Sequence, residues 1–264
     1  MTVYRLNMFA PLVAFLCLLG AGCITASAPP APDPSQQGAA LPDGFVYLSD
    51  IDDTIVQDMR YFGADNFVGR RIKGYRAPRC ILSKKAAKAL SAAQRVFLAE
   101  GRTLIVFDCY RPQQAVDDFA AWAKTDEQAQ KRAFYPDVPK DALFEQGYIA
   151  ARSGHSRGGA VDLAFVELAQ SAERTAAAPD DVDCRAPGAH LQYTPYDDFG
   201  AGYDCFDPQS HTDDARIVGE ARRNRQRLKD VLEAHGFVNY PLEWWHYSLA
   251  DEAFPDTYFS FPVE

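Results

Sequence analysis

Residues 153–166 read SGHSRGGAVDLAFV, a glycine-rich turn that runs directly into an apolar stretch. Residues 160–166 are expected to form a buried strand, because apolar side chains dominate this short run. His155 lies in the turn, and Asp162 follows it seven residues later, inside the expected strand. Imidazole and carboxylate groups both bind metal ions, so this stretch places candidate chemistry next to the core of the fold.

Regular elements are expected before this stretch. Ser83 is a typical N-cap for an alanine-rich helix from Lys84 to about Glu100, which Gly101 would end. Residues 102–108 follow as an apolar strand. Pro112 is expected at the first position of another helix, over residues 113–124.

A long helix is expected near the end of the chain. Thr212 or Asp213 would cap it, and it would end near His235, before Gly236. Helices and strands therefore alternate without a regular βαβ order. This predicts a single α+β domain whose central, largely antiparallel sheet is flanked by helices.

The second stretch with candidate catalytic or metal-binding residues is EWWHY, residues 243–247. It is expected to be a late strand or a strand edge. His155, Asp162 and His246 make a three-ligand set that suits zinc and leaves a fourth position for water. Glu243 is a candidate for the base that takes the proton of that water. Because three residues separate it from His246, this role predicts an irregular backbone between them. The pattern by itself leaves purely structural histidines as the alternative.

A third stretch, FDCYRP at residues 107–112, ends the expected strand with an arginine. The planar guanidinium of Arg111 suits a carboxylate or a developing oxyanion. An ion pair between Arg111 and Asp108 is the structural alternative.

The stretches YRP, SGHSRGGAVD and EWWHY, in this order and at these intervals, resemble the zinc D-alanyl-D-alanine dipeptidases of the VanX type, within the zinc D-Ala-D-Ala peptidases. The resemblance covers almost the whole mature body and implies the D-Ala-D-Ala peptidase/hedgehog-like fold. It implies that His155, Asp162 and His246 hold one zinc ion per chain. Glu243 would be the general base and acid, and Arg111 would stabilise the tetrahedral oxyanion.

Substrate contacts follow from the same resemblance. Ser153 and Asp204 match family positions that contact the free ammonium group of the substrate, and Tyr61 matches a pocket residue. Loop packing is the structural alternative for Ser153 and Tyr61. The implied reaction is hydrolysis of the D-Ala-D-Ala dipeptide to two D-alanines. A zinc D,D- or L,D-carboxypeptidase acting on longer peptidoglycan peptides is the alternative enzyme, and a metal-free binding lipoprotein is the non-enzymatic one.

The N-terminal residues are expected to direct export. In residues 1–22, Arg5 precedes an apolar run, and the sequence GAGC at residues 20–23 resembles a bacterial lipobox, with Gly20 where leucine is usual. Lipidation of Cys23 would anchor a periplasmic or cell-envelope protein to the membrane, with an ordinary signal peptide as the alternative. Residues 23–44, rich in proline and alanine, are expected to be a tether before a dipeptidase domain at residues 45–264.

Four cysteines remain in the expected mature domain. An even number in an exported protein indicates disulfide bonds, and pairing Cys80 with Cys109 and Cys184 with Cys205 gives two short loops. A structural zinc site is the competing interpretation, although no C-x-x-C spacing is present.

Charge and aromatic patterns disfavour other functions. With 27 basic and 36 acidic residues, the formal net charge of -9 disfavours binding to nucleic-acid phosphates. The arginine-rich run at residues 222–229 is expected to be a solvated, ion-paired helix face. Trp244 and Trp245 are expected to pack in the core and the wall of the site, with a sugar-binding platform as the alternative.

Overall fold

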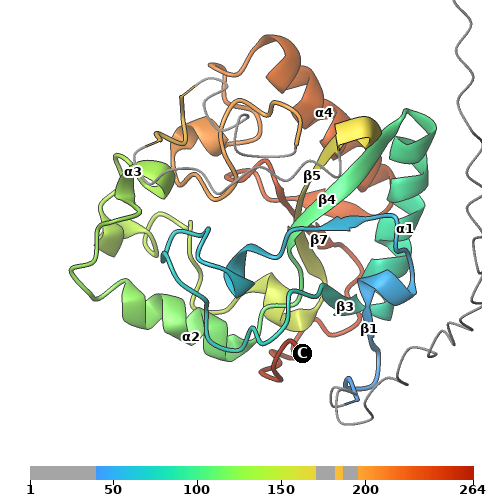
Figure 1. Cartoon of the computed structure of the whole chain (residues 1–264), viewed down its shortest axis with the longest axis horizontal. Helices are drawn as coiled ribbons and strands as arrows, with labels where there is room; N and C mark the ends of the chain where they lie inside the picture. Colours follow the sequence, from blue (N-terminus) through green and yellow to red (C-terminus); the bar gives the residue numbers. More distant parts are fainter. Residues whose placement is uncertain (1–39, 171–181, 187–195) are drawn as a thin grey trace, which may run out of the picture. The chain divides into compact units, whose positions relative to one another are not determined.

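A five-stranded sheet forms the centre of the computed structural model. Its strands lie in the order β2 (Val56–Gln57), β4 (Arg102–Asp108), β5 (Ala160–Glu167), β7 (His246–Leu249) and β6 (Phe237–Asn239). β2 is parallel to β4, and every other neighbouring pair is antiparallel. A second, antiparallel sheet pairs β1 (Phe45–Tyr47) with β3 (Ile81–Ser83). The expected α+β class with a largely antiparallel sheet is confirmed (Figure 1).

The structure describes residues 40–170, 182–186 and 196–264, and one compact unit spans Ala39–Glu264. The expected signal segment, Cys23 and all of the expected tether except residues 40–44 lie outside the described residues. Within the described ranges, no helix is both long enough and apolar enough to cross a membrane.

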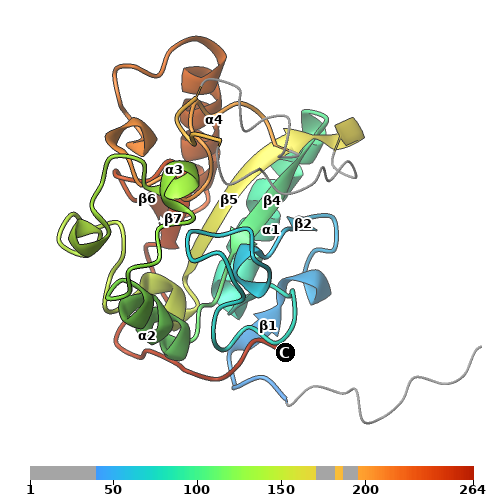
Figure 2. The same ribbon diagram turned by 60° about the vertical axis from the view of Figure 1, so that its left-hand side comes forward.

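The helices lie on opposite sides of the central sheet. They are α1 (Lys84–Ala99), α2 (Gln113–Trp122), α3 (Lys131–Phe134) and α4 (Gly219–Ala234). The short 3-10 helices are η2 (Leu48–Asp50), η3 (Arg60–Phe62), η4 (Lys140–Ala142), η5 (Gly154–Arg157), η6 (Leu168–Gln170) and η7 (Pro208–Ser210). Figures 1 and 2 show α1 on one side of β4 and β5, and α2 on the other.

Helix α1 confirms its expected start. The Ser83 hydroxyl accepts a hydrogen bond from the Ala86 N–H at 3.2 Å, which satisfies one of the free donors of the first turn. Near the other end of the helix, Phe97 stacks on Phe165 of β5 with ring centres 5.1 Å apart. The buried face of α1 is thereby fixed against the sheet.

Two expected helix starts are wrong. Pro112 is the extended N-cap of α2 rather than its first helical residue. Helix α4 begins at Gly219, and neither Thr212 nor Asp213 caps it. The Thr212 hydroxyl instead donates to Asn239 at 2.6 Å, and the Asp214 carboxylate accepts the Arg216 N–H at 2.8 Å in a local turn. The bond of Asp214 to nearby backbone competes with helix formation.

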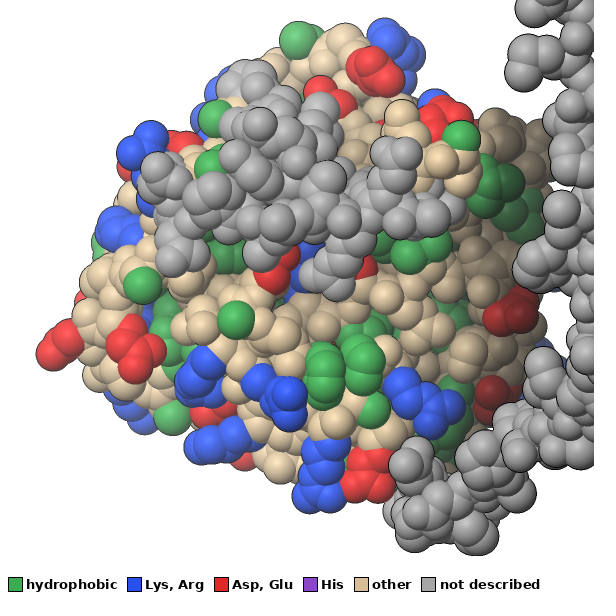
Figure 3. All heavy atoms as spheres, in the orientation of Figure 1, with side chains coloured by type: hydrophobic (Ala, Val, Ile, Leu, Met, Phe, Trp, Pro, Cys, Tyr) green, Lys and Arg blue, Asp and Glu red, His purple; other side chains and the backbone are tan. Residues whose placement is uncertain are grey.

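The arginine-rich face of α4 is ion-paired on its exposed side. Arg227 pairs with Glu100, and Arg222 pairs with Asp213. Figure 3 shows basic and acidic side chains next to one another near the end of the molecule that holds α4 in Figure 1. Arg225 is the exception to the expected solvated face, because it is only 1% exposed.

Arg225 lies on the inner face of α4. Its guanidinium donates to the Phe199 carbonyl at 2.7 Å and to the His211 carbonyl at 2.8 Å. Burial lowers the pKa of Arg225 to about 9. This arginine therefore ties α4 to two loops instead of facing solvent.

The paired tryptophans are core residues. Trp244 and Trp245 are both fully buried, and Trp244 stacks on Phe199 with ring centres 4.2 Å apart. A sugar-binding platform needs exposed rings, so this alternative is wrong.

Both disulfide bonds join the pairs that loop length favoured. Cys80 is bonded to Cys109, and Cys184 to Cys205. No cysteine among these four is therefore free to bind a structural zinc ion.

Candidate active site

The register of the central sheet brings three polar side chains next to one another. Asp162 on β5 pairs with Asp108 on β4 and, on its other side, with His246 on β7. The pairing of β4 with β5 is irregular between Val106 and Asp108. A shift of one residue moves a side chain to the opposite face of a sheet, so this irregularity decides that Asp108 lies beside Asp162.

His155 reaches the same place from the glycine-rich turn, which forms the 3-10 helix η5. The Ser153 hydroxyl caps this helix by accepting the His155 N–H at 3.2 Å. Gly158 ends the helix with a φ of 71°, a conformation that favours glycine. A Cβ at Gly158 would also overlap the ring of Phe45. Glycine at position 158 therefore allows the turn to place His155 beside the start of β5.

Three acceptor atoms converge at the strand ends. The distances are 3.1 Å from His155 Nε2 to His246 Nδ1, 3.2 Å from His155 Nε2 to Asp162 Oδ1, and 3.0 Å from His246 Nδ1 to Asp162 Oδ1. Ligand atoms around a tetrahedral zinc ion with bonds of about 2.0–2.1 Å lie about 3.3–3.4 Å apart. The ligand triangle, as we call these three atoms, thus has nearly the size of one face of such a site.

Hydrogen bonds behind the ligand triangle fix the orientation of both rings. His155 Nδ1 lies 2.7 Å from the Cys109 carbonyl, and His246 Nε2 lies 3.3 Å from the Ser248 hydroxyl. With hydrogens on these outer nitrogens, as the carbonyl requires for His155, both inner nitrogens keep lone pairs that a metal ion beside Asp162 Oδ1 would accept. Metal-binding histidines are held by outer partners of this kind. The three side chains can therefore hold a divalent metal ion.

The protonation states of Asp162 and His246 favour binding of a cation to the ligand triangle. Burial alone would raise the pKa of Asp162, but the adjacent imidazoles of His155 and His246 lower it below its usual range. Burial lowers the pKa of His246, even though Asp162 opposes that change. A charged carboxylate beside a neutral imidazole is the protonation state that metal binding requires.

Arg111 forms the expected ion pair with Asp108 and also lies beside the ligand triangle. Its Nε donates to Asp108 at 2.8 Å, as the structural alternative expects. Its Nη2 also lies 3.5 Å from Asp162 Oδ2, next to the ligand triangle. The guanidinium packs 5.0 Å from the centre of the Tyr61 ring. Asp108 therefore orients a permanent positive charge at the edge of the ligand triangle.

Glu243 lies in the predicted irregular segment. The His246 N–H donates to the Glu243 carbonyl at 3.3 Å, and β7 begins only at His246. Residues 243–245 are therefore not part of the strand, and Glu243 Oε2 lies 3.8 Å from His246 Nδ1. Burial, together with Asp162 and Asp204, raises the pKa of Glu243 well above its usual value. A cation in the ligand triangle would lower it again.

Asp204 is a further buried carboxyl group near the ligand triangle. Among the residues that the structure describes, it is the only non-glycine residue with a positive φ, 56°. Its Oδ2 accepts a hydrogen bond from the Tyr61 hydroxyl at 2.8 Å. Burial, and next the charge of Asp162, raises the pKa of Asp204 to about 8. Strained backbone conformations of this kind are concentrated at functional sites.

A cavity of about 240 Å³ connects these groups. Its lining includes every candidate site residue named from the sequence in this domain: Tyr61, Arg111, Ser153, His155, Asp162, Asp204, Glu243 and His246. Aromatic side chains complete the wall: Phe67, Phe119, Tyr148, Phe206 and Tyr240. The structure thus brings all the sequence candidates to one place.

Sequence reasoning missed several supporting residues. Tyr75 donates to Asp108 at 2.6 Å, and Tyr203 donates to Asp162 at 3.2 Å. The Cys109 carbonyl and Ser248 hold the two imidazoles. Cys109 lies within the stretch FDCYRP and Ser248 directly follows EWWHY, which is a weak signal for both. Nothing in the sequence around Tyr75 indicates its contact with Asp108.

Known proteins resemble this chain over most of its length. A family model described as D-ala-D-ala dipeptidase matches residues 42–195 and 189–264. A D-alanyl-D-alanine dipeptidase of Streptomyces coelicolor is 36% identical over 220 residues, covering 83% of this chain and 98% of that protein. Enterococcus faecalis and Enterococcus faecium proteins of the same name are 34% and 33% identical, each over 84% of this chain and 100% and 98% of their own length.

Proposed function

The chain belongs to the D-Ala-D-Ala dipeptidase family, and we propose that it is a zinc enzyme that hydrolyses the D-Ala-D-Ala dipeptide to two D-alanines. The observation that carries this proposal is the convergence of His155, Asp162 and His246 within 3.2 Å of one another, in a cavity shared with Glu243. Two nitrogens and one oxygen suit zinc, and they also accept Fe²⁺, Co²⁺ or Ni²⁺.

The free ammonium group of the dipeptide would bind at Asp204. This carboxyl group is buried and accepts a hydrogen bond from Tyr61, and no cationic side chain in the described part of the chain forms an ion pair with it. An ammonium ion beside it would favour the charged carboxylate and complete the pair. Ser153 lines the same cavity.

Hydrolysis would then use the residues around the ligand triangle. A zinc ion held there would polarise the scissile carbonyl and lower the pKa of an attacking water. Glu243 would accept the proton of that water and pass it to the leaving nitrogen as the C–N bond breaks. Arg111 would donate hydrogen bonds to the substrate oxygen on which negative charge develops.

The buried position of Asp204 favours a dipeptide over a longer peptide. A longer peptide or a blocked dipeptide would bring a neutral amide to this carboxyl group. A neutral amide cannot form the ion pair that the ammonium group makes with Asp204, so the carboxyl group would either keep its proton or become a buried charge without a partner, which costs several kcal/mol. Loss of a matched partner of this kind is what makes a binding site selective. The carboxypeptidase alternative needs no such ammonium site.

The decisive experiment measures D-alanine release by the purified domain, with and without a chelator. The substrates are D-Ala-D-Ala, its N-acetylated form and a wall pentapeptide. We expect chelator-sensitive cleavage of the free dipeptide alone. Cleavage of the blocked or longer substrates would instead make the protein a carboxypeptidase, and it would remove Asp204 from the ammonium site.

We further propose that the protein is exported and anchored through a lipid on Cys23. The support is the sequence of residues 1–23, with an apolar run that leads to GAGC. Mass spectrometry of the N-terminal peptide from the native host should find a lipid-modified cysteine as the first residue. An unmodified N-terminus elsewhere would favour the ordinary signal peptide.

An exported dipeptidase would act on wall-derived D-Ala-D-Ala and return D-alanine, because it cannot reach cytoplasmic wall precursors. We therefore expect the full-length protein to confer no glycopeptide resistance on a susceptible host. A variant lacking residues 1–22 is the control, since it would remain in the cytoplasm. Resistance from the full-length protein would contradict this role.

A further inference from the structure

Each disulfide bond ends next to a residue of the proposed site. Cys109 directly follows Asp108, and its carbonyl holds His155 Nδ1 at 2.7 Å. Cys205 directly follows Asp204. The two bonds therefore reach the same cavity from different sides, one at the metal ligands and the other at the expected ammonium site.

The Cys80–Cys109 bond connects β3 to the end of β4. Both cysteines are fully buried, and the Tyr110 N–H donates to the Ile81 carbonyl at 2.8 Å beside the bond. The Ser83 N–H, two residues along β3, donates to the Gly158 carbonyl at 2.8 Å at the end of the His155 turn. The disulfide thus joins the end of β4, whose Cys109 carbonyl contacts His155, to β3, whose Ser83 N–H contacts the end of the His155 turn.

The Cys184–Cys205 bond holds the loop that contains Asp204. The Gly202 N–H donates to the Cys184 carbonyl at 2.9 Å, and the Ser210 hydroxyl donates to the Cys205 carbonyl at 2.6 Å. The positive φ of Asp204 is a conformation that non-glycine residues rarely adopt, so the surrounding contacts must maintain it.

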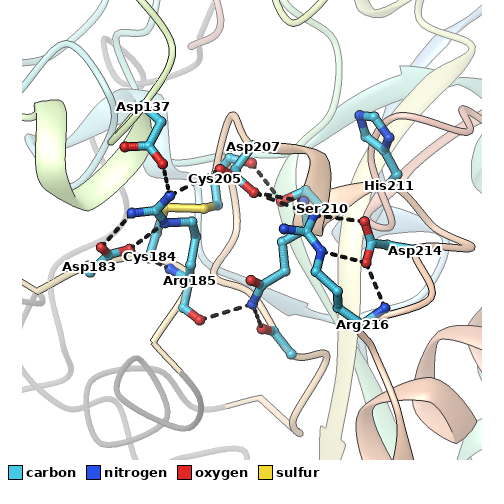
Figure 4. A network of polar contacts seen from close by, with 12 residues as sticks. Asp137, Asp183, Cys184, Arg185, Cys205, Asp207, Ser210, His211, Asp214 and Arg216 are labelled. Carbon is cyan, nitrogen blue, oxygen red and sulfur yellow. Dashed lines mark hydrogen bonds and ion pairs between the residues drawn. A yellow bond between two sulfur atoms is a disulfide. The ribbon is translucent and has the colours of Figure 1, made fainter.

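A cluster of charges strengthens the same loop. Arg185, next to Cys184, pairs with Asp183 at 2.9 Å, with Asp207 at 3.4 Å and with Asp137 (Figure 4). In Figure 4 these acidic side chains surround the Arg185 guanidinium beside the disulfide. Arg185 and the disulfide together tie Asp207, three residues after Asp204, to two other segments.

We propose that the two disulfides are positioning elements for different halves of the site. Cys80–Cys109 positions the metal ligand His155 through the Cys109 carbonyl, and Cys184–Cys205 positions Asp204 for the substrate ammonium group. This inference rests on the proposed function, because it assigns zinc binding to one bond and dipeptide recognition to the other.

Two double variants test the proposal: Cys80→Ala with Cys109→Ala, and Cys184→Ala with Cys205→Ala. Zinc affinity is measured by competition with a chromogenic chelator, and kcat and KM for D-Ala-D-Ala are measured at saturating zinc. Loss of the first bond should weaken zinc binding about tenfold or more, as changes behind metal ligands do, with KM nearly unchanged. Loss of the second should raise KM about tenfold while zinc affinity stays the same.

Arg185→Gln is a milder variant that keeps all the cysteines. It should raise KM in the same direction as loss of the Cys184–Cys205 bond, by a smaller factor, and leave zinc affinity unchanged. If an alanine pair fails to fold, the matching valine pair fills the buried space and takes its place. Folding of every variant is checked by thermal unfolding, so that a general loss of stability is recognised.

The proposal is overturned if both folded double variants change the same parameter, or if neither changes zinc affinity or KM. The proposed function fails separately, when zinc-loaded wild-type protein releases no D-alanine. In that case, zinc affinity still decides the role of Cys80–Cys109. Equilibrium binding of D-Ala-D-Ala then decides the role of Cys184–Cys205.

Discussion

Glu243 differs from the other carboxyl groups of the cavity in its distance from the ligand triangle. Asp162 completes the triangle, whereas Glu243 Oε2 lies 3.8 Å from His246 Nδ1. Glu243 is not one of the three residues whose ligand atoms converge, yet it lies close enough to contact a water molecule bound beside them. The position fits a residue that moves a proton rather than one that holds the metal.

Replacing Glu243 with alanine should therefore separate turnover from metal binding. We expect kcat to fall by about 10²–10⁴-fold, the usual contribution of a general base. Zinc content after dialysis should match that of wild type, and His246→Ala serves as the control that loses zinc. Retained turnover in the Glu243 variant would remove this residue from the base role.

Asp204 predicts a pH dependence of stability. Its pKa in the folded protein is raised to about 8, compared with about 3.9 in an unfolded chain. Between these values the folded protein keeps a proton that the unfolded chain has lost, so this group lowers the free energy of unfolding as pH rises from about 4 to 8. Asp204→Asn removes the effect.

Urea unfolding of metal-free wild type and Asp204→Asn at pH 5 and pH 8 measures this contribution. Other groups titrate in both proteins, so the difference between the two proteins isolates Asp204. The variant should gain stability relative to wild type at the higher pH. Equal changes in both proteins would show that Asp204 is not held in its protonated form.

At the scale of elements, the turn that carries His155 depends on one glycine. Gly158 has a φ of 71°, and a Cβ at this position would overlap the Phe45 ring. Gly101 has a similar φ of 76°, but a Cβ there would meet nothing within 4 Å. The two glycines thus separate the cost of backbone conformation from the cost of a steric clash.

Gly101→Ala should lower the free energy of unfolding by about 1–2 kcal/mol, the cost of a left-handed conformation. Gly158→Ala should cost more and should also weaken zinc binding, because the clash displaces η5. Chemical unfolding and zinc competition on both variants provide the comparison. Equal destabilisation with unchanged zinc affinity would mean that the turn tolerates the added methyl group.

At the scale of the whole molecule, the ligand triangle joins distant parts of the chain. η5, β5 and β7 each supply one atom of the ligand triangle. A ligand that binds only the folded state stabilises it by mass action, and this amounts to about 2.7 kcal/mol at a concentration of one hundred times Kd. The proposed zinc ion should therefore stabilise the entire domain.

Thermal unfolding with zinc and with a chelator tests this coupling. Wild type should unfold at a clearly lower temperature in the chelator, and His155→Ala should show almost no response. Glu243→Ala should keep the wild-type response, because it removes no ligand. A His155→Ala variant that still responds to zinc would place the metal elsewhere.

Local patterns in the sequence determined much of this protein. Short-range side-chain and backbone preferences set the bounds of β4 and the Ser83 cap of α1. The family resemblance of short motifs pointed to His155, Asp162 and His246, and the spacing of Glu243 from His246 predicted the irregular backbone between them. Elements and motifs of this kind lie within short stretches of the chain, so they can be read without knowing the fold.

Only the tertiary structure decided the features that depend on distant segments. Thr212 bonds to Asn239 instead of capping α4, Arg225 turns inward to two loop carbonyls, and Tyr75 supports Asp108 from another part of the chain. The register between β4, β5 and β7 sets which side chains share a face. Competing partners for a polar group are decided by which segments meet in the fold, and the sequence around that group does not contain this information.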